Sequence, residues 1–187
     1  MAISQIVTNS IASGQTITSP TLVNPTISGT VTNASGTAPL FRVYPSAAQA
    51  INNGATVTIQ NNTKVYDLGG CFNNTGSTVT LNGISAPAYS FTPNVAGYYW
   101  VSGIVFLGTV SGGSVQTNIL VNGGTVVTAS ATTNVNGVGP QASLLTYLNG
   151  TGDYVQLAGY NATGTNLNTL ANRSDLNIFE GFFVRSA

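Results

Sequence analysis

The chain has 187 residues, of which four are Lys or Arg and four are Asp or Glu, so the formal net charge is zero. Soluble domains carry roughly 25% charged residues, whereas this one carries 4%, too few cations to neutralise a run of phosphates or to hold an anionic membrane surface. The chain has no histidine, which excludes a Ser-His-Asp triad and a His-metal site. It has one cysteine, which excludes an intramolecular disulfide.

The first block of the chain, residues 1–40, is rich in small hydroxylated residues, and residues 19–39 carry no charged side chain. Pro20 and Pro25 disfavour a helix or a central strand and keep the chain locally extended. A series of its aliphatic residues recurs every four to six positions, a spacing that fits neither a helix nor a strand. The series consists of Ile6, Ile11, Ile17, Leu22, Ile27 and Val31. We therefore predict an arm that docks to a larger particle, either as a tail ordered only against its partner or as a shaft wound from several identical chains.

The N-terminal sequence MAISQIVTNS lacks the positive start and the continuous apolar centre of a signal peptide. No stretch of the chain reaches the ~18–20 apolar residues that span a bilayer. We expect the chain to be made in the cytoplasm, to insert into no membrane and to leave the cell by lysis.

From residue 41 to residue 187 the sequence consists of short β-type runs separated by turn residues. Asn-Gly and Gly-Gly pairs, as in VNGGT and LNGTGD, adopt positive φ at little cost and form tight hairpins. Ten strands are predicted, at residues 56–60, 64–69, 77–82, 88–91, 97–107, 114–121, 125–130, 141–148, 154–160 and 175–184. One short helix is predicted at residues 46–51, SAAQAI. Many short strands with frequent turns indicate an all-β sandwich or barrel.

The run YYWVSGIVFLG, residues 98–108, is apolar on both faces of the strand it predicts. A sheet covered on one side only would alternate between apolar and polar residues. A second surface must therefore cover this sheet, and the simplest candidate is another copy of the chain. The sequence predicts a homo-oligomer.

Three motifs in the second block resemble those of the globular C1q domain, a member of the TNF-like jelly rolls. FTPNVAGYYWVSG resembles the central motif, although Val101 stands where that family usually has Phe, and the upstream part of the motif is not found at its usual spacing. NGTGDYVQLAGY resembles the Gly-Asp-x-Val-x-Leu pattern, and FEGFFV resembles the closing Phe-x-Gly-Phe strand. The matching residues are Phe91, Gly97 and Tyr99, then Gly152, Asp153, Val155 and Leu157, and finally Phe179, Gly181 and Phe182.

The resemblance implies a ten-stranded jelly roll that assembles as a tight homotrimer, with aromatic residues near the threefold axis and loops that bind other molecules without catalysis. Candidates for the core or the trimer axis are Tyr99, Phe106, Phe179 and Phe182. Tyr98 and Trp100 alternate with Tyr99 and are candidates for the subunit interface. The first block resembles the Ser/Thr-rich, Pro-punctuated openings of bacteriophage fibres and head decorations.

Few residues are available for chemistry or metal binding. Four scattered carboxylates make a glycosidase-type pair or a high-affinity calcium site unfavourable, which leaves only a weak ion site of carbonyls on the axis, and no cofactor is predicted. A loop of one aromatic residue with amides and hydroxyls suits a neutral glycan. Its candidate contact residues are Tyr160, Asn161, Thr163 and Asn166; an ordinary solvent-exposed loop is the alternative.

Together these features favour a non-enzymatic bacteriophage virion protein, a trimeric fibre-tip adhesin that contacts a host-surface glycan or another envelope component. A capsid head fibre or decoration protein is the nearest alternative, because it also needs an arm, a trimer and an inert outer surface. A cellular C1q-like carbohydrate-binding module is the second alternative, and a secretion signal would favour it.

Overall fold

The computed structural model describes residues 38–108, 110–135, 137–170 and 172–187. Of the predicted arm, only its last three residues lie in this part. The predicted docking residues, Ile6, Ile11, Ile17, Leu22 and Ile27, lie outside the described residues.

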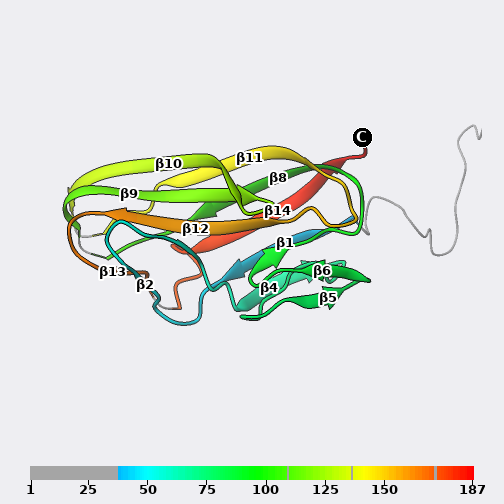
Figure 1. The fold of residues 1–187 in the computed structure, drawn as a ribbon, viewed down its shortest axis with the longest axis horizontal. Coiled ribbons are helices and arrows are strands. Elements are labelled where there is room, and N and C mark those ends of the chain that lie inside the picture. Colours follow the sequence, from blue (N-terminus) through cyan, green and yellow to red (C-terminus); the bar gives the residue numbers. More distant parts are fainter. Residues whose placement is uncertain (1–37, 109, 136, 171) are drawn as a thin grey trace, which may run out of the picture. The chain divides into compact units, whose positions relative to one another are not determined.

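Ten strands form two antiparallel five-stranded sheets (Figure 1). The first sheet contains, in spatial order, β11 (Gln141–Leu148), β8 (Gly97–Ile104), β14 (Ile178–Arg185), β1 (Leu40–Tyr44) and β4 (Thr63–Leu68). The second sheet contains β10 (Gly124–Val135), β9 (Val110–Val121), β12 (Val155–Ala162) and β3 (Thr56–Thr58), and β7 (Ser90–Phe91) also pairs with β12. Two short pairs complete the described part: β2 (Ala50–Ile51) with β13 (Leu167–Asn168), and β5 (Val79–Leu81) with β6 (Ile84–Ala86).

Each of the ten predicted strands overlaps an observed one, and β11 has the predicted bounds. The turn chemistry explains this agreement. Asn122 and Gly123 connect β9 to β10 with φ of 52° and 80°, the left-handed conformation that a two-residue hairpin turn requires. Four strands were not predicted, namely β1, β2, β6 and β13.

The predicted helix at residues 46–51 is wrong, because this segment forms a bend at residues 46–47 and ends in β2. Gln49 accounts for the difference. Its backbone N–H donates to Thr169 Oγ1, its Nε2 donates to the Thr58 carbonyl, and its Oε1 accepts from the Gln60 N–H. These bonds to neighbouring segments outweigh the modest helix propensity of the alanines.

The predicted strand at residues 175–184 begins late, since β14 starts at Ile178. The preceding residues form a turn in which Arg173 and Asp175 pair through two hydrogen bonds of 2.8 and 2.7 Å. The Leu176 and Asn177 N–H groups both donate to the Arg173 carbonyl, so the backbone before Ile178 forms a hydrogen-bonded turn and not a strand.

The core between the two sheets contains a cluster of aromatic residues at whose centre lies Phe41. The Phe41 ring stacks on Phe91 and Phe72 with centroids 4.4 and 5.2 Å away, and meets the edge of Phe179 at 4.9 Å. Tyr99 lies edge-on to Phe91 at 5.6 Å. Three of the motif aromatics, Phe91, Tyr99 and Phe179, therefore meet in one fully buried cluster, which gives the motif spacing a packing reason.

Two motif glycines leave room for this cluster. A Cβ on Gly181 would lie 2.9 Å from a ring carbon of Phe41 and 2.9 Å from the Trp100 carbonyl. A Cβ on Gly97 would meet the Phe183 ring and the Arg185 carbonyl at 2.4 and 2.5 Å. Any larger residue at either position would have to displace backbone.

Candidate functional site

The outer face of the first sheet, the side turned away from the second sheet, is unusually apolar. The strand registers bring one residue from each of the five strands into line across this face. We call this line the apolar row; in spatial order it consists of Leu68, Leu40, Phe182, Trp100 and Leu145. Three of its members are among the large hydrophobic residues that the monomer exposes. Single exposed hydrophobic residues are normal, but a contiguous row of them marks an interaction surface.

A second aromatic group extends the apolar row toward one end of the sheet. Tyr98 pairs in register with Tyr147, and their rings meet edge to face with centroids 5.8 Å apart. The Arg185 guanidinium lies over the Tyr98 ring, 5.4 Å from its centroid, a geometry that favours a cation–π attraction.

A polar row lies on the other side of the apolar row. In register across the sheet it consists of Tyr66, Arg42, Glu180, Ser102 and Ser143. Arg42 Nη1 donates to Glu180 Oε2 at 3.2 Å, and both side chains are about one-third exposed. An ion pair at this exposure contributes little to the stability of the folded chain.

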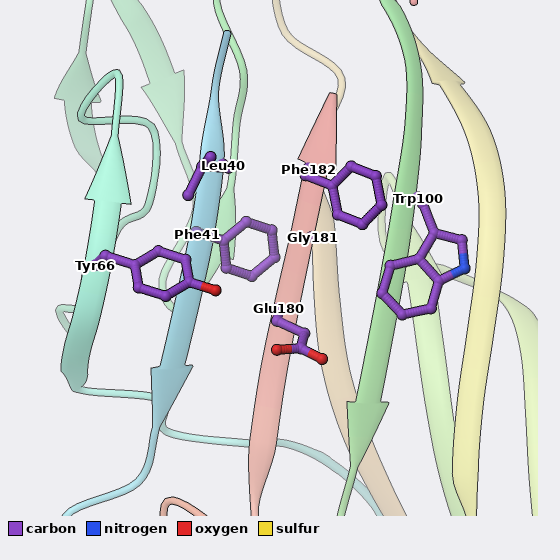
Figure 2. A pocket seen from close by; sticks show the side chains of 7 residues that line it. All are labelled: Leu40, Phe41, Tyr66, Trp100, Glu180, Gly181 and Phe182. Carbon is purple, nitrogen blue, oxygen red and sulfur yellow. The ribbon is translucent and has the colours of Figure 1, made fainter. Parts of the chain in front are cut away.

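A groove of about 310 Å³ runs between the two rows (Figure 2). Figure 2 shows Tyr66 on one side of it and Phe182 with Trp100 on the other, while the Glu180 carboxylate points into the space between them. The Trp100 and Phe182 rings lie 5.5 Å apart. The groove therefore combines an aromatic wall with one carboxylate.

The structure separates the six predicted aromatic residues into three groups. Tyr99 and Phe179 are fully buried between the sheets. Phe106 lies over the 137–139 loop, where a Cβ on Gly137 would meet its ring at 2.5 Å. The remaining three, Phe182, Tyr98 and Trp100, share the outer face of the first sheet.

Sequence reasoning missed the other members of this face. Leu40 and Leu68 lie on strands β1 and β4, of which β1 was not predicted at all. Leu145 and Tyr147 lie on β11 in the run QASLLTYL, where they occupy the alternate, exposed positions. That alternation could have predicted the apolar outer face, since a strand that carries large hydrophobic residues on its exposed face needs a covering surface.

The predicted glycan-contact loop is stabilised from within by one of its own candidates. Asn161 is fully buried; its Nδ2 donates to the Ile51 and Thr165 carbonyls, and its Oδ1 accepts from the Thr163 N–H and hydroxyl. Asn161 is thus a scaffold of the loop and not an accessible contact. Thr163 is engaged in the same network, and the Asn166 Oδ1 accepts from the Asn53 N–H. The half-buried Tyr160 lies in register with Gln116 on β9.

Each carboxylate of the chain has a structural partner. Glu180 pairs with Arg42, Asp67 with Lys64 at 2.8 Å, and Asp175 with Arg173. Asp153 accepts from Asn122 Nδ2 and from the Asn149 N–H, both at 2.9 Å, and so stabilises the turn before β12. Within the described residues no group of three His, Cys, Asp or Glu side chains is placed to hold a metal ion, and no helix is long and apolar enough to cross a membrane.

Two weakly acidic side chains lie in the interior. Burial raises the pKa of the Cys71 thiol above its ordinary value, and the nearby Asp67 adds to the effect. Burial likewise raises the pKa of the Tyr99 hydroxyl, which donates to the Val95 carbonyl at 2.7 Å. Both groups are therefore neutral near pH 7.

Comparison with solved structures places this architecture among known folds. The crystal structure of murine APRIL at pH 5.0 matches with a TM-score of 0.56 and 10% sequence identity, over 79% of this chain and 99% of that chain. The pH 8.5 form matches with a TM-score of 0.55 and 10% identity, over 78% and 98%. The fold is a TNF-like jelly roll. This confirms the predicted fold class.

A third similar structure is Eiger TNF from S. frugiperda, with a TM-score of 0.46 and 11% identity over 80% of this chain and 93% of that chain. No family model and no curated protein matches the sequence. At 10% identity the likeness to murine APRIL extends to the fold alone.

Proposed function

We propose that this protein is a non-enzymatic, homotrimeric component of a bacteriophage particle, whose jelly roll faces outward and attaches to the host surface. The observation that carries the proposal is the outer face of the first sheet, with its apolar row, its aromatic groove and its single ion pair. Three copies packed about a threefold axis would remove this face from water. The burial of apolar area is the main driving force for such an assembly.

The chemistry of the described surface supports a binding or structural role over catalysis. Every carboxylate is engaged in a turn or an ion pair, so none is left to face a second one across a cleft, as glycoside hydrolysis requires. A chain with 4% charged residues depends little on counterions, because hydroxyl and amide groups keep its surface hydrated. That suits a particle exposed to variable salt and pH.

The receptor in this proposal is a neutral host glycan or another envelope component, contacted by end loops of the jelly roll. Because Asn161 is buried, the contact would fall on the exposed tips that surround it, at Asn53, Thr165 and Asn166. Residues 1–40 would join the trimer to the particle.

Locating the chain on its particle tests the function. Cryo-electron microscopy of the purified source particle, with this chain traced in the map, is expected to place it at a tail or baseplate. Density across the capsid would instead make it a head fibre or decoration protein. A particle without the chain would overturn the virion proposal. Light scattering tests the assembly separately, since a monomeric mass at micromolar concentration would contradict the trimer.

A further inference from the structure

The chain contains six Asn-x-Ser/Thr sequences in which x is not proline, the acceptor signal for N-linked glycosylation. They begin at Asn33, Asn61, Asn73, Asn149, Asn161 and Asn172. Of the five that the structure describes, three have an interior asparagine: Asn61 and Asn161 are 0% exposed, and Asn73 is 1% exposed. The other two, Asn149 and Asn172, are exposed.

Two of the interior asparagines form the same loop scaffold. Asn73 begins the sequence NNTGS and Asn161 begins NATGT. In each loop the asparagine Oδ1 accepts from the N–H and the hydroxyl of the Thr two residues later. In each loop the Nδ2 also donates to the carbonyl four residues later, at 2.8 Å from Asn73 and 2.7 Å from Asn161. The acceptor sequence is thus itself the loop-forming sequence.

The Nδ2 groups of these asparagines also bind segments outside their own loops. Asn73 Nδ2 lies 2.9 and 2.8 Å from the Ala86 and Pro87 carbonyls, and Asn161 Nδ2 lies 2.9 Å from the Ile51 carbonyl. Glycosylation joins the sugar C1 to this same Nδ2, which loses one hydrogen to the transfer. A glycan at either position would remove a donor and force a bulky, hydrated group into the core.

Asn61 adds a third position with the same consequence. Neither atom of its side-chain amide has a hydrogen-bond partner among the described residues, and the residue is fully buried. Since an interior site is close-packed, a sugar on Asn61 could be accommodated only by opening the segment between β3 and β4.

We propose that this protein folds in a compartment where N-linked glycosylation does not act, because Asn61, Asn73 and Asn161 must be bare for the jelly roll to close. In the secretory pathway the sugar is transferred to the extended chain, before folding can hide these asparagines. The inference is independent of the virion proposal. It separates this chain from a protein that matures as a secreted eukaryotic glycoprotein, even though both could share the jelly-roll fold.

The test expresses the full chain in one eukaryotic cell line, once in the cytosol and once behind a signal peptide for the endoplasmic reticulum. We expect the cytosolic chain to fold. We expect the directed chain to carry sugar at one or more of the three interior asparagines, to fail secretion, and to be secreted when an inhibitor blocks glycan transfer. Peptide mass spectrometry identifies the occupied positions.

Two control variants assign the block to the interior asparagines. Replacement of the exposed acceptors, Asn149→Gln with Asn172→Gln, should leave the directed chain blocked. Secretion of a folded protein from untreated cells, with the interior asparagines bare or glycosylated, would overturn the proposal. Failure of the inhibitor to restore secretion would overturn it too.

A bacterial expression experiment tests the need for the bare amide without any glycan. Asn161→Asp removes the two Nδ2 donors, whereas Asn149→Asp keeps the Oδ1 that accepts from the Thr151, Gly152 and Asp153 N–H groups. We expect Asn161→Asp to lower the Tm by roughly 5–10 °C, because the Ile51 and Thr165 carbonyls lose their donor, and Asn149→Asp to leave it nearly unchanged. Equal effects of the two variants would contradict the role assigned to Asn161.

Discussion

Replacement of Phe182 by aspartate is expected to dissociate the proposed trimer without unfolding the jelly roll. Phe182 stands at the centre of the apolar row and is 47% exposed in the single chain. Because a phenylalanine buries about 150–250 Å², roughly half of that area, about 70–120 Å², remains to be covered by a partner. At about 25 cal/mol per Å² this area is worth about 2–3 kcal/mol for each subunit and about 6–9 kcal/mol for three.

This loss corresponds to an increase of about four to six decades in the dissociation constant of the trimer. The aspartate adds the cost of desolvating a charge in the interface. Because the side chain projects away from the core, the folded monomer should lose little stability. The variant is therefore expected to be a folded monomer at micromolar concentration.

The chain offers its own reporter for the measurement. Its single tryptophan, Trp100, lies against Phe182 with ring centroids 5.5 Å apart. Dissociation should expose the indole and move its emission to longer wavelength, in step with a fall in mass by light scattering. Val126→Asp is the matched control, since Val126 is 55% exposed on β10 of the second sheet, and it should leave both signals unchanged.

Three results would refute this reasoning. The first is a Phe182→Asp protein with the mass of the wild type. The second is a Val126→Asp protein that dissociates equally. The third is a wild-type chain whose tryptophan emission does not change on dilution through its dissociation.

Three further outcomes are expected. Gly150→Ala should lower the free energy of unfolding by about 1–3 kcal/mol, because Gly150 has φ +71° and a Cβ would lie 2.6 Å from the Ala96 backbone nitrogen. Gly152→Ala in the same turn has nothing within 4 Å of its Cβ and should be nearly neutral. Urea unfolding compares the two variants, and a reversed order would refute the argument. Because the folded pKa values of Cys71 and Tyr99 are raised, the contribution of these two groups to stability should be complete below about pH 9, near the ordinary thiol pKa, and decline above it. A Tm series from pH 7 to 11 measures this decline, and a constant Tm over the alkaline range would contradict it. The Tm should change little between pH 5 and 8, since the chain has no histidine and the pKa of Asp175 is lowered to about 2. The ion pair of Asp175 with Arg173 therefore weakens only as the pH falls below about 4. A Tm step near pH 6.5 would count against this expectation.

The elements that sequence reasoning located correctly are those with strong local signals. The strand at residues 141–148 was predicted with its observed bounds. The Asn122–Gly123 turn was readable because only certain residues adopt positive φ cheaply. The helix at residues 46–51 failed because bonds from Gln49 to Thr58, Gln60 and Thr169 decide the conformation there, and these partners are not local.

The candidate surface was only partly predictable. Alternation around Tyr99 correctly separated Tyr98 and Trp100 from the buried face of β8, because side chains alternate along any regular strand. The same rule places Phe182 on the exposed face of β14 and Phe179 on its buried face, although both were grouped as candidates for the core or the axis. The period of two could separate them only once the bounds and register of β14 were known.

The sequence by itself determined the all-β class, the approximate positions of ten strands, the tight turns and the scarcity of charge, because these follow from residue type and from short-range periodicity. Tertiary structure alone decided that Leu68, Leu40 and Leu145 line up with Phe182 and Trp100. It also decided that Asn161 lies inside its loop and not on it. Both depend on the pairing of segments distant in the chain, and strand register is set by the packing of the whole sandwich rather than by any one strand.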